Sequence, residues 1–185
     1  MNTPSAATFS TPDTQSRICV DVKINREHID YLVDQVWETS EPALNEFLFR
    51  KKARWTRSRD QRVCRAKLGP LAERMIRRAR VTYSVVLVAL VYLQRARPHL
   101  QIASESFLWE RLLIGSIVLA DKYVNDCTML NRHWAICSGK FGNMDVNRIE
   151  RDLLAVLDWD VKLSEKELVD VHVAIRDRKK LNGSR

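Results

Sequence analysis

The segment spanning residues 104–125 constrains the fold most, because apolar residues recur there on more than one side of a helix. One stripe, at intervals of three and four, consists of Leu113, Ile117, Ala120 and Val124. The neighbouring stripe consists of Leu112, Ser116, Leu119 and Tyr123. A helix that is apolar on several sides belongs in the centre of a bundle. Gly115 inside it costs about 1 kcal/mol relative to alanine, so we expect another helix to approach closely there.

Other segments also carry helical periodicity. We expect helices over residues 24–37, 70–79, 133–138, 146–157 and 164–180. The first should end before Pro42, and Pro70 should lie in the first turn of the second. Residues 81–95 are apolar nearly all round, which fits a buried helix or a buried strand; length favours a helix, and no alternating segment offers strand partners. The pattern therefore predicts an all-α bundle.

Composition indicates one globular domain with a basic surface. The chain has 185 residues, 45% of them hydrophobic, and a formal net charge of +8. Positive charge is dense in residues 50–67, which we interpret as a solvated face or linker, with a nuclear-import signal or a phosphate-binding patch as the alternatives. The Ser-, Thr- and Pro-rich N-terminus has no apolar stretch typical of a secretory signal and should be a disordered tail.

The sequence carries no motif typical of catalysis. Glycine-rich phosphate loops, HExxH, GxSxG and paired CxxC motifs are absent, so we predict neither enzymatic activity nor a bound cofactor. The cysteines lack the spacing of a zinc site and are interpreted as reduced thiols of an intracellular protein; they are Cys19, Cys64, Cys127 and Cys137. The longest apolar run, residues 81–93, is too short to span a membrane.

Two charged residues interrupt apolar helix faces. Lys122 follows Val118 by one turn, and Glu150 lies between Val146 and Leu154. Each could lie at the rim of the core, with the lysine extending its stem over apolar surface. In the alternative hypothesis, the two helices are neighbours and both side chains offer charge-assisted hydrogen bonds to a partner.

At these residues the sequence resembles the cyclin family. The segments LIGSIVLADKYVND (113–126) and VNRIERDLLAVLDWDV (146–161) are similar to the third and fifth helices of a cyclin box. The segment RARVTYSVVLVALVYLQRAR (78–97) and the HWA at 133–135 resemble fungal PCL-type cyclins of the Pho group. The match covers residues 68–163 and implies a single five-helix box with flanking helices, which also favours a helix at 81–95.

The resemblance implies a partner and a binding site. A cyclin binds and activates a cyclin-dependent protein kinase, here of the Pho type, as a heterodimer, and has no catalysis of its own. The lysine and glutamate that bond the kinase around its regulatory helix correspond to Lys122 and Glu150. Apolar positions against that helix, each equally compatible with plain core, are Leu119, Tyr123, Leu154 and Trp159. Asp126 is a further candidate, paired with an arginine near the activation segment of the kinase.

The expected organisation is a tail at 1–22, an N-terminal helix and basic linker at 23–67, the cyclin box at 68–163, and a C-terminal helix and tail at 164–185. The segment LAERMIRRARV departs from the docking patch of cell-cycle cyclins, and too few residues follow the box for a second bundle. A cyclin of this kind would act in the nucleus, the cytoplasm or both, in the cell cycle or in signalling, without a membrane. The rival hypothesis is a basic helical nucleic-acid-binding protein of the same fold.

Overall fold

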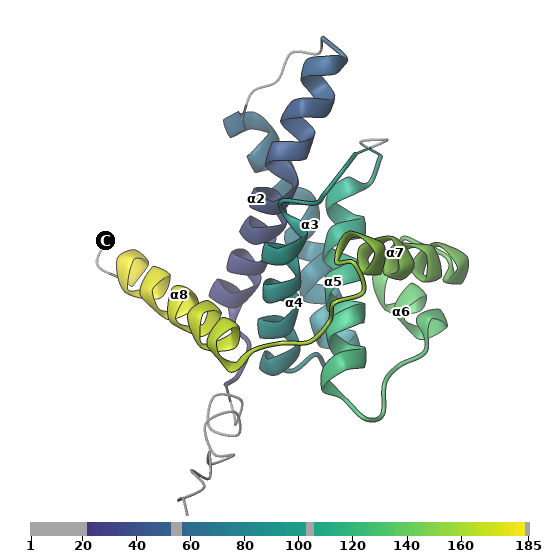
Figure 1. Ribbon diagram of the computed structural model, residues 1–185. Coiled ribbons are helices and arrows are strands. Elements are labelled where there is room, and N and C mark those ends of the chain that lie inside the picture. Colours follow the sequence, from purple (N-terminus) through teal and green to yellow (C-terminus); the bar gives the residue numbers. More distant parts are fainter. Residues whose placement is uncertain (1–21, 53–56, 103–105, 184–185) are drawn as a thin grey trace, which may run out of the picture.

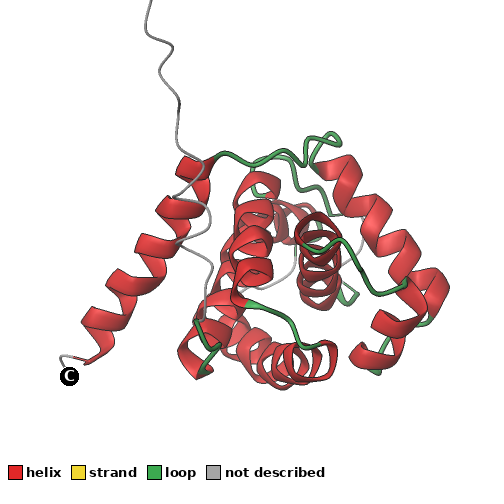
Figure 2. Ribbon diagram, turned by 90° about the horizontal axis from the view of Figure 1, so that it is seen from below, coloured by secondary structure: helices red, strands yellow, loops and turns green. Residues whose placement is uncertain are grey.

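The computed structural model describes residues 22–52, 57–102 and 106–183. Along these residues the chain forms helices and loops without strands (Figure 2). The helices are α2 (Arg26–Arg50), α3 (Arg57–Ala79), α4 (Tyr83–Ala96), α5 (Leu108–Val124), α6 (Asn131–Ser138), α7 (Asn143–Val156) and α8 (Glu165–Gly183). The predicted all-α fold is confirmed, whereas the predicted tail at 1–22 lies outside the described residues except for Val22.

The core forms around α4 and α5, the two most apolar helices. Every residue from Val85 to Leu93 in α4 is buried, and so is every residue from Leu112 to Asp121 in α5. The segment at 81–95, for which the pattern fitted a buried helix or a buried strand, is therefore a buried helix. In Figure 1, α6 and α7 lie on one side of this pair and α8 on the other. No helix within the described ranges is long and apolar enough to cross a bilayer.

The close approach expected at Gly115 is confirmed. A Cβ atom placed there would lie 3.1 Å from Cγ2 of Ile149 and 3.4 Å from Cδ2 of Leu153, both in α7. These distances are short for carbon contacts, so α7 packs onto the backbone of α5 at this point. The absence of a side chain at Gly115 therefore sets the spacing of the two helices that carry Lys122 and Glu150.

Two predicted helix boundaries at prolines are wrong. Helix α2 continues through Pro42 to Arg50, and α3 begins at Arg57, so that Pro70 lies inside it. A proline within a helix costs about 3 kcal/mol, but burial of flanking apolar residues offsets much of this cost. In α3 the buried stripe of Cys64, Leu68, Leu71 and Met75 passes across Pro70 without a break.

The basic segment contributes to the helical hairpin of α2 and α3 at the top of Figure 1. Arg57 pairs with Glu41 at 2.7 Å, and Arg65 pairs with the buried Asp34. Part of the positive charge therefore neutralises carboxylates of α2. Within the segment 50–67, interpreted from its charge as a solvated face or linker, residues 57–67 form part of helix α3 and not a linker. Most of their side chains are exposed, as a solvated face requires.

The helix predicted from Ser104 begins at Leu108 instead. Ser106 and Phe107 precede it in a turn, and Phe107 has a left-handed backbone with a φ of +56°. A helix cannot continue through that conformation in an L-residue, which explains the later start.

Candidate functional site

Lys122 and Glu150 face each other between α5 and α7. The Lys122 ammonium donates to both Glu150 carboxylate oxygens, Oε1 and Oε2, each at 2.7 Å. The lysine side chain is 31% exposed and the glutamate side chain 14%. The expected neighbourhood of the two helices is thus observed, and the two charges neutralise each other at the edge of the core.

Asn131 completes this pair, and sequence reasoning missed it. Its side-chain amide donates to Glu150 Oε2 at 2.7 Å and to Asn147 Oδ1 at 2.7 Å. Asn131 is the first residue of the short helix α6, so this network joins α5, α6 and α7. A single asparagine after a polar bend gives no signal in the sequence, because its partners lie 16 and 19 residues away.

Within the described residues, the hydrogen-bonding capacity of this network is not exhausted. An ammonium has three donors, of which the Glu150 carboxylate uses two, and each carboxylate oxygen has two lone pairs. Among the bonds between described residues, one donor of Lys122 and one lone pair of Glu150 Oε1 are left over. Because both side chains are partly exposed, a docked backbone group can reach them. Lys122 also lies in the last turn of α5, where a cation interacts favourably with the helix dipole.

The four apolar candidates divide between core and surface. Leu119 is 6% exposed and belongs to the core, and Leu154 is half-buried against it. Tyr123 and Trp159 are exposed, at 45% and 64%. Exposed aromatic residues of this size are typical of protein interfaces, so Tyr123 and Trp159 are the stronger candidates for contact with a partner.

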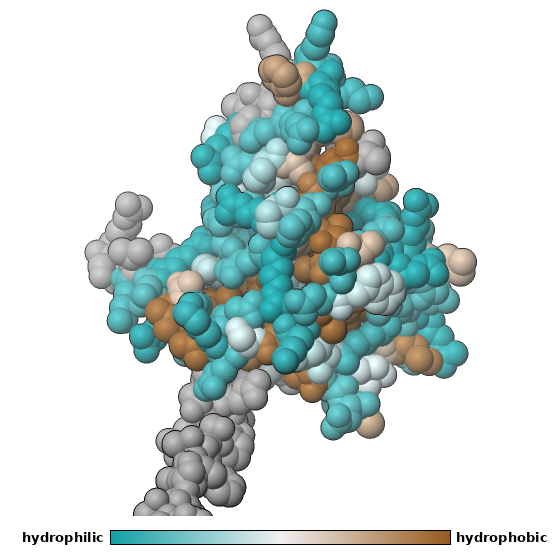
Figure 3. Space-filling model, in the orientation of Figure 1, coloured by the Kyte–Doolittle hydropathy of each residue, from teal (hydrophilic) through white to brown (hydrophobic). Residues whose placement is uncertain are grey.

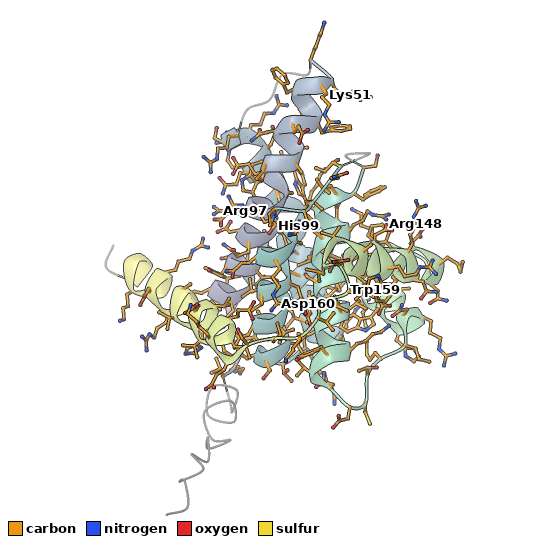
Figure 4. The ribbon with its side chains drawn as sticks, in the orientation of Figure 1. Lys51, Arg97, His99, Arg148, Trp159 and Asp160 are labelled. Atoms are coloured by element: carbon orange, nitrogen blue, oxygen red, sulfur yellow. The ribbon has the colours of Figure 1, made fainter. Side chains whose placement is uncertain are left out.

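Tyr123 contacts the segment that leaves α7, and Trp159 is part of that segment. This segment, residues 157–164, crosses α5 and α4 on its way to α8 (Figure 1). The Leu163 backbone N–H donates to the Tyr123 hydroxyl at 3.4 Å, and the Tyr123 ring packs edge-on against Tyr92 with centroids 6.3 Å apart. Trp159 and Asp160 are labelled along this segment in Figure 4.

Five of the predicted residues lie at the end of α5, on α7 or directly after α7, and we call this set the α5–α7 face. It comprises Lys122, Tyr123, Glu150, Leu154 and Trp159. Figure 3, drawn from the side that this crossing segment occupies, shows apolar residues among hydrophilic ones over the middle of the molecule. Asp126 is exposed in the bend after α5.

Comparison with known proteins agrees with this arrangement. Residues 36–162, more than half of the chain, match the family described as cyclin, N-terminal domain. The chain belongs to the cyclin family. The match begins within α2, earlier than the resemblance at Leu68, because α2 is an integral part of the packed bundle.

The chain is also similar to curated relatives that are named PHO85 cyclins or P-type cyclins. It is 33% identical over 105 residues to PHO85 cyclin-2 and 31% identical over 100 residues to PHO85 cyclin-1, both of Saccharomyces cerevisiae. These matches cover 55% and 52% of this chain. It is also 35% identical over 94 residues, half of this chain, to Cyclin-P3-1 of Oryza sativa subsp. japonica. The chain spans only 34%, 36% and 39% of the length of these relatives.

Proposed function

We propose that this chain binds and activates a Pho-type cyclin-dependent protein kinase through the α5–α7 face. The observation that carries this proposal is the Lys122–Glu150 pair, a charged, partly exposed pair at the edge of an apolar core. It lies at the end of α5, next to the exposed aromatic residue Tyr123. The relatives named PHO85 cyclins support the choice of kinase.

Binding would act on the kinase by a population shift. An apolar helix of the kinase docks on Tyr123, Leu154 and Trp159. Its backbone groups bond the donor of Lys122 and the lone pair of Glu150 that no described residue uses. These bonds fix the register of the docked helix. The kinase conformation in which that helix faces the nucleotide is then favoured, and the chain itself performs no chemistry.

The test measures affinity and activity together. A purified Pho-type kinase is titrated with the native chain and with the Lys122→Ala, Glu150→Ala double variant, while phosphorylation of a generic substrate is followed. We expect stimulation by the native chain and at least a tenfold loss of affinity in the variant, since about 1.4 kcal/mol corresponds to tenfold and charge-assisted bonds contribute about 1.5–3 kcal/mol each.

A matched control comes from the same two helices. Arg111 of α5 pairs with Asp152 of α7 at 2.7 Å, and neither belongs to the α5–α7 face. The Arg111→Ala, Asp152→Ala variant removes an ion pair between α5 and α7 and should leave kinase affinity within about twofold of native. Equal losses in both double variants would contradict the assignment of the site, and no complex with the native chain would contradict the proposed partner.

Nucleic acid is the rival partner, and its binding to the native chain is measured separately at several salt concentrations. Nucleic-acid binding through the basic residues would fall steeply with salt, by a factor on the order of a thousand between 50 and 200 mM for about six phosphate contacts. Docking through the largely apolar α5–α7 face should be only weakly dependent on salt.

A further inference from the structure

Trp159 is held in an unfavourable backbone conformation. Asp158 and Trp159 both have positive φ angles, +51° and +59°, although neither is a glycine. The left-handed region costs roughly 1–2 kcal/mol per L-residue, so contacts elsewhere must hold the segment. Both residues are bonded back to the end of α7: the Trp159 backbone N–H donates to the Leu154 carbonyl at 2.9 Å, and the Asp158 backbone N–H donates to the Ala155 carbonyl at 3.1 Å.

Two side chains of α4 hold the residues that follow. The Tyr92 hydroxyl donates to the Val161 carbonyl at 3.0 Å. The Arg95 guanidinium donates to the Asp160 carbonyl at 3.2 Å and to the Lys162 carbonyl at 2.8 Å. Three successive carbonyls after Trp159 are therefore bonded to α4. Burial raises the pKa of Tyr92, which keeps its hydroxyl a neutral donor.

The orientation of Arg95 depends in turn on α8. Glu167, in the first turn of α8, accepts from Arg95 Nε at 2.7 Å and from Nη2 at 2.8 Å. Two parallel bonds to a carboxylate fix the plane of a guanidinium, and this plane aims its remaining N–H groups at the segment. Ser164 also donates to Glu167 Oε2, from its backbone N–H at 2.8 Å and from its hydroxyl at 2.6 Å.

We propose that Arg95 and Glu167 are positioning residues that hold Trp159 in its partner-binding orientation. This inference rests on the proposed function, since it assigns Trp159 a contact with the kinase. Glu167 acts through Arg95 and the carbonyls of the segment. Helix α8 lies beyond the matched residues 36–162. Through Glu167 it contributes to the orientation of a kinase-binding residue.

A double-mutant cycle separates positioning from general stability. Glu167→Ala should weaken kinase affinity about fivefold in the native background and less than twofold in the Trp159→Ala background, because contacts that act through one residue are non-additive. Lys166→Ala is the matched control; its ion pair with Asp170 lies on the exposed side of α8, and its removal should change affinity less than twofold. An equal loss from Glu167→Ala in both backgrounds would overturn the proposal, as would an unchanged affinity in Trp159→Ala.

A second readout uses the free chain and needs no kinase. With 5-fluorotryptophan incorporated, the ¹⁹F resonance of Trp159 is assigned by its absence in Trp159→Phe. Glu167→Ala and Arg95→Lys should shift or broaden this resonance and leave those of the buried Trp37 and Trp134 in place. An unmoved Trp159 resonance would overturn the positioning role. Failure of the native chain to bind the kinase would instead overturn the proposed function, while the ¹⁹F result still decides whether α8 positions Trp159.

Discussion

At the scale of single residues, the informative positions are those that depart from the helical pattern. Lys122 and Glu150 interrupt apolar faces because they bond each other at the edge of the core. Gly115 interrupts a helix of good helix formers because Ile149 of α7 occupies the space of a side chain. Each exception to the pattern marks a contact between α5 and α7.

Substitution of Gly115 tests this contact. Gly115→Ala gains about 1 kcal/mol of helix propensity but forces Ile149 and Leu153 outward, at a cost of about 1–3 kcal/mol. We expect a net loss of about 1 kcal/mol in the free energy of unfolding, measured by urea denaturation, and a larger loss for Gly115→Val. Gly69→Ala is the control, because a Cβ there lies 3.8 Å from the nearest atom, Nη2 of Arg26, and the stability should change by less than about 1 kcal/mol. A stabilised Gly115→Ala variant would contradict the tight contact.

At the scale of elements, α8 is bound to the bundle by a stripe of apolar side chains and by polar contacts of its first turn. Leu168, Val171 and Ile175 are buried in the core. The start of the helix carries Glu167, whose bonds to Ser164 and Arg95 link α8 to its own cap and to α4. Although burial raises the pKa of Glu167, the hydrogen bonds from Ser164 and Arg95 outweigh it and lower the pKa below its usual value.

The lowered pKa of Glu167 predicts how its contribution to stability depends on pH. A carboxylate with a lower pKa in the folded state stabilises the fold above its unfolded pKa of about 4.3, and this contribution disappears as the pH falls through the folded value. Glu167→Gln should therefore lower the free energy of unfolding by about 1 kcal/mol at pH 7. The difference from native should shrink as the pH falls from 7 and be lost below the lowered pKa of the folded state.

The control for this titration is Glu165→Gln, which removes a carboxylate from the same first turn of α8. Denaturant unfolding of native and variant chains between pH 7 and pH 3 provides the measurement. The prediction fails if both variants differ from native equally, because the helix dipole rather than the Arg95 pair would then explain the effect.

At the scale of the whole molecule, distant parts of the chain converge on one buried carboxylate. Asp34 of α2, with a side chain 3% exposed, accepts from Arg65 of α3 at 2.7 Å and from Arg178 of α8. Arg178 also lies over the Tyr31 ring, 5.3 Å from its centroid. Helices α2 and α8 are therefore joined directly, beside the bundle of α4 and α5.

Removal of this carboxylate should destabilise the whole fold. Asp34→Asn leaves two guanidinium groups without their counter-charge, and because both arginines are partly exposed we expect a loss of about 2 kcal/mol rather than the 3–5 kcal/mol of a fully buried pair. Asp30→Asn, which removes the exposed partner of Arg26 one turn earlier, should cost under about 0.5 kcal/mol in the same urea titration. Similar losses in the two variants would show that Asp34 does not join the helices.

The sequence alone determined the class of fold and pointed to the residues at the centre of the candidate site. Apolar spacing predicts helices because it depends only on neighbours within a few turns, and a charge within an apolar stripe is visible for the same reason. Tertiary structure decided which of these side chains meet. The partners of Lys122, Arg95 and Asp34 lie 28, 72 and 144 residues away. Helices pass through Pro42 and Pro70 because packing against distant residues outweighs a local preference, and that packing exists only once the bundle has formed.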